Sequence, residues 1–227
     1  MDYSTPCQYS IRLIDRLKSL DTKNVLNFEL INKAIYWARK YHGEQKRKSG
    51  EPYYSHPLEV AYMISEYKLK TDVIVASILH DIIEDTEVTA GMILDNFSWR
   101  IAEMVDMLTR DRPDGSKLSV EEILNNAYHL RDKEVLLIKL LDRFHNIQTV
   151  ESMQYHKQKA FVIETLNDVI ITTTIFCDLN LEKELNSKSF TMLYGKDVAT
   201  QMINRRYNIF SIFDSYQPPL PSFQNEI

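Results

Sequence analysis

The sequence predicts an all-α protein, and three observations support this fold class. Apolar residues recur mainly at the helical spacing of three or four positions. Only Pro113 occurs between Pro57 and Pro218, so long stretches are free to form helices. No segment of useful length shows the apolar–polar alternation of a strand. With 227 residues, 44% of them hydrophobic, the chain suits one domain with a sizeable core, with or without an appendage.

The first helices follow from short amphipathic patterns. Apolar residues at positions 11, 14, 17 and 20 predict an opening helix, and those from Phe28 to Ala38 predict a second one that ends near Gly43. A basic loop over 43–52 follows. The dipeptide His56-Pro57 opens the next helix, because proline is well tolerated in a first helical turn.

A central, buried helix is predicted from about Thr71 to Ile83, because residues 73–79 are apolar on most sides. Two or three shorter helices should follow up to about Leu130, with a turn at 112–115. No internal repeats are present.

Asp132 is placed to cap a helix from Glu134 to about Val150. A long helix is expected over 158–185, and the pattern weakens after about Lys188. The last segment, 215–227, contains three prolines and looks irregular.

The composition excludes several classes of protein. A formal net charge of −5 argues against a general nucleic-acid binder. No two of the five glycines are placed for a phosphate-binding loop, so side chains or a metal must bind any phosphate. Two cysteines, Cys7 and Cys177, fit a reducing compartment. The chain starts without the features of a signal peptide, and its longest apolar stretch, 169–181, is too short for a bilayer. We therefore expect a cytoplasmic protein without a membrane partner.

The strongest chemical signal is the hexapeptide from His80 to Asp85. An adjacent imidazole and carboxylate, His80-Asp81, can bind one metal ion. Glu84 and Asp85 lie four residues further on and so close to the same helix face. Such polar groups at the end of the most apolar helix are costly unless something pairs them. Taken alone, an HD dipeptide is more often a polar helix end with solvated carboxylates.

Two further segments strengthen the metal hypothesis. His56 stands at a helix start, where an isolated histidine is usually a capping or core residue. Asp142, Asn146 and Thr149 fall on one face of an otherwise apolar helix. An aspartate there needs a metal or a strong partner, and a salt bridge to Arg143 or to another helix is the alternative.

The combined pattern resembles that of HD-domain metal phosphohydrolases, in which a histidine, an HD pair and a distant aspartate recur in this order. The resemblance is closer still to the hydrolase domain of RelA/SpoT-type alarmone enzymes, through residues 48–57, 79–86 and 139–149. It implies a compact HD-domain bundle of about 8–11 helices. We expect this domain over 1–190, with its motifs within 24–165 and a partly irregular extension over 191–227. The chain thus resembles a stand-alone small alarmone hydrolase.

The resemblance implies a reaction and a set of site residues. The reaction is Mn²⁺-dependent hydrolysis of guanosine 3′,5′-bis(diphosphate), ppGpp or pppGpp, to GDP or GTP and pyrophosphate. One Mn²⁺ would be held by His56, His80, Asp81 and Asp142. The catalytic acids would be Glu84 and Asp85. The nucleotide contacts would be Arg47, Lys48, Ser49, Asn146 and Thr149.

Physical chemistry is consistent with these assignments. Lys46-Arg47-Lys48 is the densest basic cluster, which would give an acidic protein a local contact for an anionic substrate; alone it is equally a solvated loop. Arg47 is suited to stacking on guanine. Glu84 would orient or deprotonate the attacking water, and Asp85 would assist proton transfer or hold the hydrated metal; the sequence does not divide these roles.

Other activities stay open because the match fades after Thr149. Gln148 and Ala160 stand where family members are often basic, so the pyrophosphate end of the pocket differs. The same fold acting on another nucleotide, such as a dinucleotide 2′-phosphate, is the first alternative, and an inactive nucleotide-binding regulator is the second. A homo-oligomer is also left open. The remaining histidines are read as structural or surface residues, with His145 as a candidate for a supporting contact to the ligands.

Overall fold

The computed structural model describes residues 2–67, 70–150, 154–176, 179–196, 199–200 and 202–204. These residues form eleven helices and no strand, which confirms the all-α prediction. The helices are α1 (Gln8–Leu20), α2 (Phe28–His42), α3 (Ser55–Tyr67), α4 (Thr71–Leu79), α5 (Ile82–Asp85), α6 (Ala90–Asn96), α7 (Trp99–Leu108), α8 (Val120–His129), α9 (Lys133–Gln148), α10 (Tyr155–Phe176) and α11 (Leu179–Tyr194).

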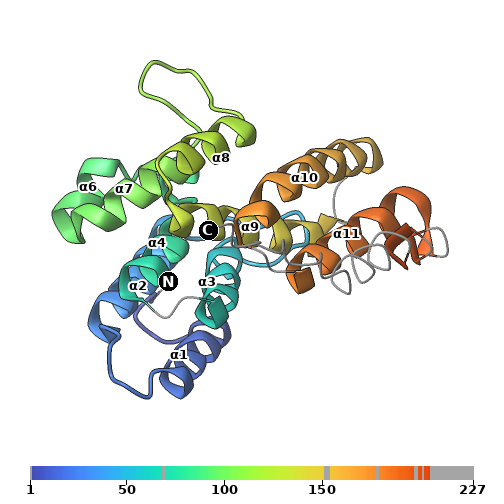
Figure 1. The fold of residues 1–227 in the computed structure, drawn as a ribbon. Helices are drawn as coiled ribbons and strands as arrows, with labels where there is room; N and C mark the ends of the chain where they lie inside the picture. Colours follow the sequence, from blue (N-terminus) through green and yellow to red (C-terminus); the bar gives the residue numbers. More distant parts are fainter. Residues whose placement is uncertain are drawn as a thin grey trace, which may run out of the picture.

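Two apolar helices, α4 and α9, form the centre of the bundle. Every residue of α4 from Val73 to Leu79 is buried, and α4 packs against α2, α3, α7 and α9. In α9 the run from Val135 to Phe144 is buried as well. Figure 1 shows α9 in the middle, between α1–α4 on one side and α10 and α11 on the other. Polar side chains on α4 and α9 are therefore held in a packed interior.

Local signals in the sequence explain where several helices begin and end. The side chain of Asp132 accepts hydrogen bonds from the backbone N–H groups of Glu134 and Val135, as predicted for the cap of α9. Ser119 and Glu122 form a capping box at the start of α8. Gly43 ends α2 with a φ of 51°, a conformation that favours glycine.

Two predicted helices differ from those observed. The helix expected to reach Ile83 ends at Leu79, and a separate turn, α5, carries the two acids. His80 and Asp81 lie in the break between them, where Asp81 has φ −98° and ψ −4°. The long helix expected over 158–185 is two helices, α10 and α11. Residues 205–227 of the expected extension lie outside the described residues.

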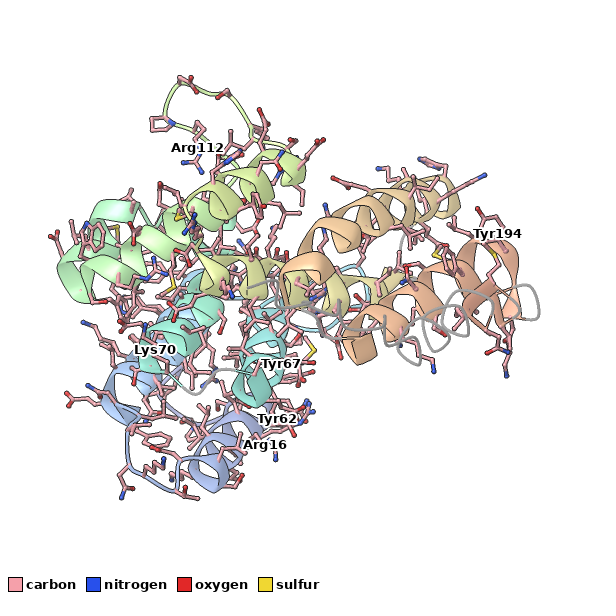
Figure 2. The ribbon with its side chains drawn as sticks, viewed as in Figure 1. Arg16, Tyr62, Tyr67, Lys70, Arg112 and Tyr194 are labelled. Atoms are coloured by element: carbon pink, nitrogen blue, oxygen red, sulfur yellow. The ribbon has the colours of Figure 1, made fainter. Side chains whose placement is uncertain are left out.

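The outer face of α3 is covered by α1. Arg12 of α1 pairs with Glu59 of α3 and stacks over Tyr62, 4.0 Å from the ring centroid. Arg16 and Tyr62 lie together on the same face in Figure 2. These contacts hold α3, which carries His56, against the rest of the bundle. Within the described part of the chain, no helix has the length and apolar character to cross a membrane.

Candidate metal centre and adjoining cleft

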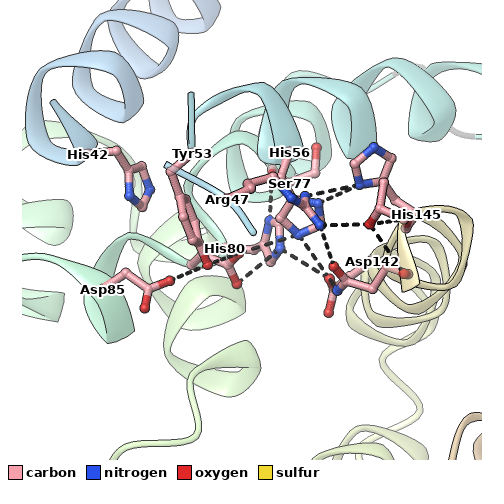
Figure 3. Close-up of polar contacts among 12 residues, drawn as sticks. His42, Arg47, Tyr53, His56, Ser77, His80, Asp85, Asp142 and His145 are labelled. Carbon is pink, nitrogen blue, oxygen red and sulfur yellow. Dashed lines mark hydrogen bonds and ion pairs between the residues drawn. The ribbon is translucent and has the colours of Figure 1, made fainter. Parts of the chain in front are cut away.

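The four predicted metal ligands come together from three separate segments. His56 lies in the first turn of α3, His80 and Asp81 follow α4, and Asp142 lies within α9. The Nε2 atom of His56 is 3.1 Å from an oxygen of Asp142 and 3.4 Å from an oxygen of Asp81. One donor atom each of His56, His80 and Asp142 lies within 4.8 Å of the others (Figure 3). The cluster has the size of a single-ion site.

The orientation of His80 fits a metal cation. Its Nδ1 atom donates a hydrogen bond to the carbonyl of Ser77, at 2.8 Å, so Nε2 faces the cluster. This Nε2 atom is buried and makes no hydrogen bond to any described residue, although an oxygen of Asp81 lies 3.1 Å away. Burial alone disfavours the charged imidazole, but Asp81 and Asp142 outweigh it and raise the pKa of His80 to about 9. The same carboxylates attract a divalent cation, which displaces such a proton when it binds.

Asp142 is a buried carboxylate whose charge is balanced within α9. Lys139, buried one turn earlier, donates to one carboxylate oxygen at 3.0 Å, and the amide of Asn146 donates to the other at 2.6 Å. Burial works against the ionised form, but Lys139 and the two histidines hold the pKa of Asp142 well below its ordinary value. Of the two alternatives, a salt bridge to Arg143 is not found among the described residues, where Arg143 pairs with Glu164 of α10 at 3.0 Å. A contact to another helix is present, because an oxygen of Asp142 lies 3.1 Å from Nε2 of His56 on α3.

The two predicted acids, Glu84 and Asp85, stand beside the cluster on α5. They line the same cavity of about 390 Å³ as His56, Asp81 and Asp142. Glu84 accepts a hydrogen bond from the backbone N–H of Arg110, and Asp85 accepts one from the hydroxyl of Tyr53. Loss of hydration at the cavity wall raises the pKa of both carboxyls above the ordinary values. Two carboxyl groups with raised pKa values are suited to proton transfer.

The basic loop between α2 and α3 reaches the cavity through Arg47 and Lys48. Arg47 donates to the side chains of Asn146, at 2.9 Å, and Thr149, at 3.1 Å. The structure thus brings three of the five predicted nucleotide contacts into one group. Ser49 is not part of it: the side chain is exposed, lies near Glu51 and does not line the cavity.

Sequence reasoning missed several residues at this site. Arg110, Lys139 and Arg143 also line the cavity and add positive charge to it. Lys139 and Arg143 could have been predicted from the sequence, since both lie within one helical turn of Asp142. Arg110 could not, because the turn after α7 brings it to Glu84 from a distant part of the chain.

Tyr53 and His145 complete the surroundings of the ligands. The ring of Tyr53 stacks on His42, with centroids 4.7 Å apart, while its hydroxyl binds Asp85. His145 lies between His56 and Arg47 and is partly buried. Burial, together with His56 and Arg47, lowers the pKa of His145 to about 3. Its imidazole is therefore neutral at physiological pH.

A helical bundle with a buried His/Asp cluster and two flanking acids defines a class of metal-binding domain with the groups needed for hydrolysis. Comparison with known families identifies the class: a model described as HD domain matches residues 34–167, and the chain belongs to this family. A solved structure described as "A metazoan ortholog of SpoT hydrolyzes ppGpp and plays a role in starvation responses" has the same fold. Its TM-score is 0.56 with 19% identity, over 84% of this chain and 98% of the other.

Curated relatives have a higher sequence identity to this chain than the solved structure has. A Mycoplasma genitalium protein named "Probable guanosine-3′,5′-bis(diphosphate) 3′-pyrophosphohydrolase" is 39% identical over 149 residues, which is 61% of this chain and 21% of the relative. An Aquifex aeolicus protein named "Guanosine-3′,5′-bis(diphosphate) 3′-pyrophosphohydrolase" is 32% identical over 192 residues, 82% of this chain and 27% of the relative. A Myxococcus xanthus protein named "GTP pyrophosphokinase" is 38% identical over 62% of this chain and 20% of the relative. The chain thus matches only a small part of each relative's length.

Proposed function

We propose that this chain hydrolyses guanosine 3′,5′-bis(diphosphate), ppGpp or pppGpp, to GDP or GTP and pyrophosphate, with one Mn²⁺ as cofactor. The observation that carries the proposal is the meeting of three groups in one cavity: the His/Asp cluster, the acids of α5 and the Arg47 group. The names of the Mycoplasma and Aquifex relatives support the substrate. A cytoplasmic location agrees with the low cysteine content of the sequence.

His56, His80, Asp81 and Asp142 would hold the metal ion. Mixed imidazole and carboxylate donors suit a first-row cation such as Mn²⁺. Bound there, such a cation lowers the pKa of a water molecule and withdraws charge from a phosphate oxygen. The protein's own contribution to the centre is its charge balance. Lys139 offsets one of the two carboxylates, so the site has a net negative charge for a divalent ion once the proton on His80 is displaced.

The chemical step requires two proton transfers. The water oxygen forms a bond to the phosphorus attached to the ribose 3′-oxygen, and the bond between that phosphorus and the 3′-oxygen breaks. The water gives up a proton and the leaving 3′-oxygen gains one. Glu84 and Asp85 divide these two tasks, because both line the cavity and both have a raised pKa. The Arg110 N–H and the Tyr53 hydroxyl hold the two carboxyls in place.

The substrate carries two diphosphates, and the cavity offers basic side chains to receive them. Arg47 and Lys48 line one part of it. Arg110 and Arg143, the second of them paired with Glu164, are further cations on its wall. These arginines supply positive charge that the α10 sequence lacks at Ala160. Bidentate guanidinium contacts are well suited to phosphate oxygens.

The proposal is tested by incubating the purified chain with Mn²⁺ and ppGpp and separating the products by chromatography. We expect GDP and pyrophosphate in equal amounts, and none from the Asp81→Ala variant, which lacks one metal ligand. A dinucleotide 2′-phosphate serves as the competing substrate. A far higher kcat/KM for that compound, or tight ppGpp binding without turnover, would overturn the proposal in favour of another nucleotide or of a regulator.

A further inference from the structure

His145 bridges the candidate metal centre and the basic loop through a single nitrogen atom. Its Nδ1 lies 2.7 Å from Nδ1 of His56 and 3.3 Å from an Nη atom of Arg47. The rings of His56 and His145 are stacked, with centroids 4.9 Å apart. Figure 3 shows His145 on the far side of His56 from His80. Two nitrogen atoms that belong to different segments therefore approach the same lone pair.

The charge state of Arg47 decides which of these nitrogens carry hydrogen. A guanidinium group only donates hydrogen bonds and is always protonated. Nδ1 of His145 must therefore accept, and the proton of this neutral ring lies on Nε2. The short contact between the two imidazoles then requires His56 to donate from its own Nδ1. With Nδ1 committed as a donor, Nε2 is the nitrogen of His56 that is left for the metal centre. In the metal-free structure Nε2 is hydrogen-bonded to the Asp142 carboxylate at 3.1 Å, and a cation that binds there displaces the proton of that contact.

Removal of Arg47 would remove this constraint. The proton between the two imidazoles could then sit on Nδ1 of His145, so that Nδ1 of His56 accepts it and Nε2 carries the proton of a neutral His56 ring. A histidine in that tautomer cannot bind a metal through Nε2 until its proton moves. The Arg47–His145 pair thus prepares His56 in its metal-binding form.

The other histidine of the centre is prepared differently. Nδ1 of His80 donates to the backbone carbonyl of Ser77, an acceptor that no side-chain substitution removes. The acceptor for His56 is a side chain, and that side chain is in contact with the loop at the cavity edge. Of the two histidines, His56 is therefore the one connected to the basic loop. Asp142 has a separate connection, because Arg47 donates to Asn146 and Asn146 donates to Asp142.

We infer that His145 is a positioning residue that fixes the ring tautomer of His56, and that Arg47 acts on the metal centre through it. The inference deepens the proposed function and rests on the metal site described there. It links metal affinity to the residue expected to hold the nucleotide.

Calorimetric titration of the metal-free full chain with Mn²⁺ tests the role of His145. We expect His145→Leu to weaken Mn²⁺ binding by about 10–100-fold, the usual loss when a supporting partner of a metal ligand is removed. His145→Asn, which restores an acceptor near the position of Nδ1, should bind Mn²⁺ close to wild type. His129→Leu, a change of an exposed histidine on α8, is the matched control and should have no effect. Thermal unfolding of each metal-free variant checks that it folds.

A double-mutant cycle separates positioning from a general structural role. Arg47→Ala should weaken Mn²⁺ binding in the wild-type background and have a clearly smaller effect in His145→Leu, where only the contact through Asn146 to Asp142 remains. If the two losses simply add, Arg47 does not act through His145 and the inference is wrong.

Imidazole ¹⁵N spectra of the metal-free wild-type chain test the inference without any substitution. We expect the His145 proton on Nε2 and a proton on Nδ1 of His56, and a mixture of proton positions between the two Nδ1 atoms in Arg47→Ala. A His145 proton on Nδ1 in the wild-type chain overturns the inference.

These measurements need no substrate, so they distinguish the two proposals. Turnover of ppGpp together with unchanged Mn²⁺ binding in His145→Leu would remove the inference and leave the function. The expected Mn²⁺ coupling in a chain that does not hydrolyse ppGpp would leave the inference and remove the proposed substrate.

Discussion

The candidate metal centre and the basic loop of residues 43–52 are neighbours built in opposite ways. His80 and Asp142 are buried, 1% and 5% exposed, at sites fixed by packed helices. Lys48 and Ser49 are exposed, at the tip of a turn held by backbone hydrogen bonds between Arg47 and Glu51 and between Gly50 and Arg47. The loop is tied to the acidic wall by the Gln45 side chain, which donates to the Asp85 carbonyl.

This difference shows how burial couples polar groups. In the centre each charge depends on its neighbours, since the loss of one partner leaves another buried and unpaired. At the tip of the loop, water replaces a lost hydrogen-bond partner, so single substitutions there change the free energy of unfolding very little. Arg47 belongs to both regions, because it contacts Asn146, Thr149 and His145 of the α9 segment. The effect of substitutions should therefore decrease from the centre, through Arg47, to the loop tip.

The largest effect is expected at Asp142. Asp142→Ala leaves Lys139 buried without its carboxylate, which should cost about 3–5 kcal/mol of unfolding free energy. Mn²⁺ binding should be lost as well. Denaturant unfolding measures the loss of unfolding free energy, and calorimetry measures the loss of Mn²⁺ binding. The matched control is the double variant Lys139→Met, Asp142→Leu, which removes both charges and should unfold less easily than the single variant. Equal stability of the two would contradict the coupling.

Glu84→Gln should leave Mn²⁺ affinity unchanged and lower kcat by about 10²–10⁴-fold, the usual contribution of a general acid or base. The metal-free variant should also be more stable than wild type at neutral pH. Burial raises the pKa of Glu84, so the ionised carboxylate costs the folded state stability. The gain should therefore be complete above the raised pKa and vanish below the ordinary value of 4.5, where the wild-type group is protonated in both states. A stability gain that persists in acid would contradict this explanation.

Tyr53→Phe removes the hydroxyl that donates to Asp85. We expect kcat to fall by about tenfold, since one hydrogen bond to a charged group is worth about 1.5 kcal/mol or more. That hydrogen bond lowers the pKa of Asp85, against the burial that raises it, so its loss should shift the pH–rate profile to higher pH. Tyr54→Phe, a change of the next residue in the chain, is the control and should keep the wild-type pH–rate profile. An unshifted profile in Tyr53→Phe would exclude Asp85 from proton transfer.

Arg47→Ala should mainly raise KM for ppGpp, by about tenfold or more, because it removes a charged group from the cavity edge. Steady-state kinetics at saturating Mn²⁺ separate this effect from the weaker metal binding inferred above. A fall in kcat at unchanged KM would show that Arg47 does not hold the nucleotide.

The smallest effect is expected for Ser49→Ala, at the loop tip. Ser49 is exposed and does not line the cavity, so stability should change by less than about 0.5 kcal/mol and KM hardly at all. A marked rise in KM would show that the loop closes over the nucleotide. That outcome would restore Ser49 to the binding group that the family resemblance implies.

The sequence predicts those parts of the site that lie within one helix. Asp142 and Asn146 share a face of α9 because helical periodicity alone places them there, and Thr149, the residue that caps the end of the helix, lies beside them. The end of α4 was not predictable in this way, because residues 80–83 continue the helical pattern of the sequence. In the structure the helix is interrupted at His80 and Asp81, and both side chains point to the metal centre. Contacts between distant segments, such as Arg110 with Glu84 or His56 with His145, come from helix packing, and no local pattern encodes them.

The central claim is that His56, His80, Asp81 and Asp142 together hold one divalent cation. A crystal structure of the Mn²⁺-soaked protein, with anomalous differences collected for manganese, tests this most directly. We expect one strong peak in contact with both Nε2 atoms and with the two carboxylates, and no such peak in Asp81→Ala. An ion bound elsewhere, or a peak that contacts the acids of α5 and neither histidine, would contradict it.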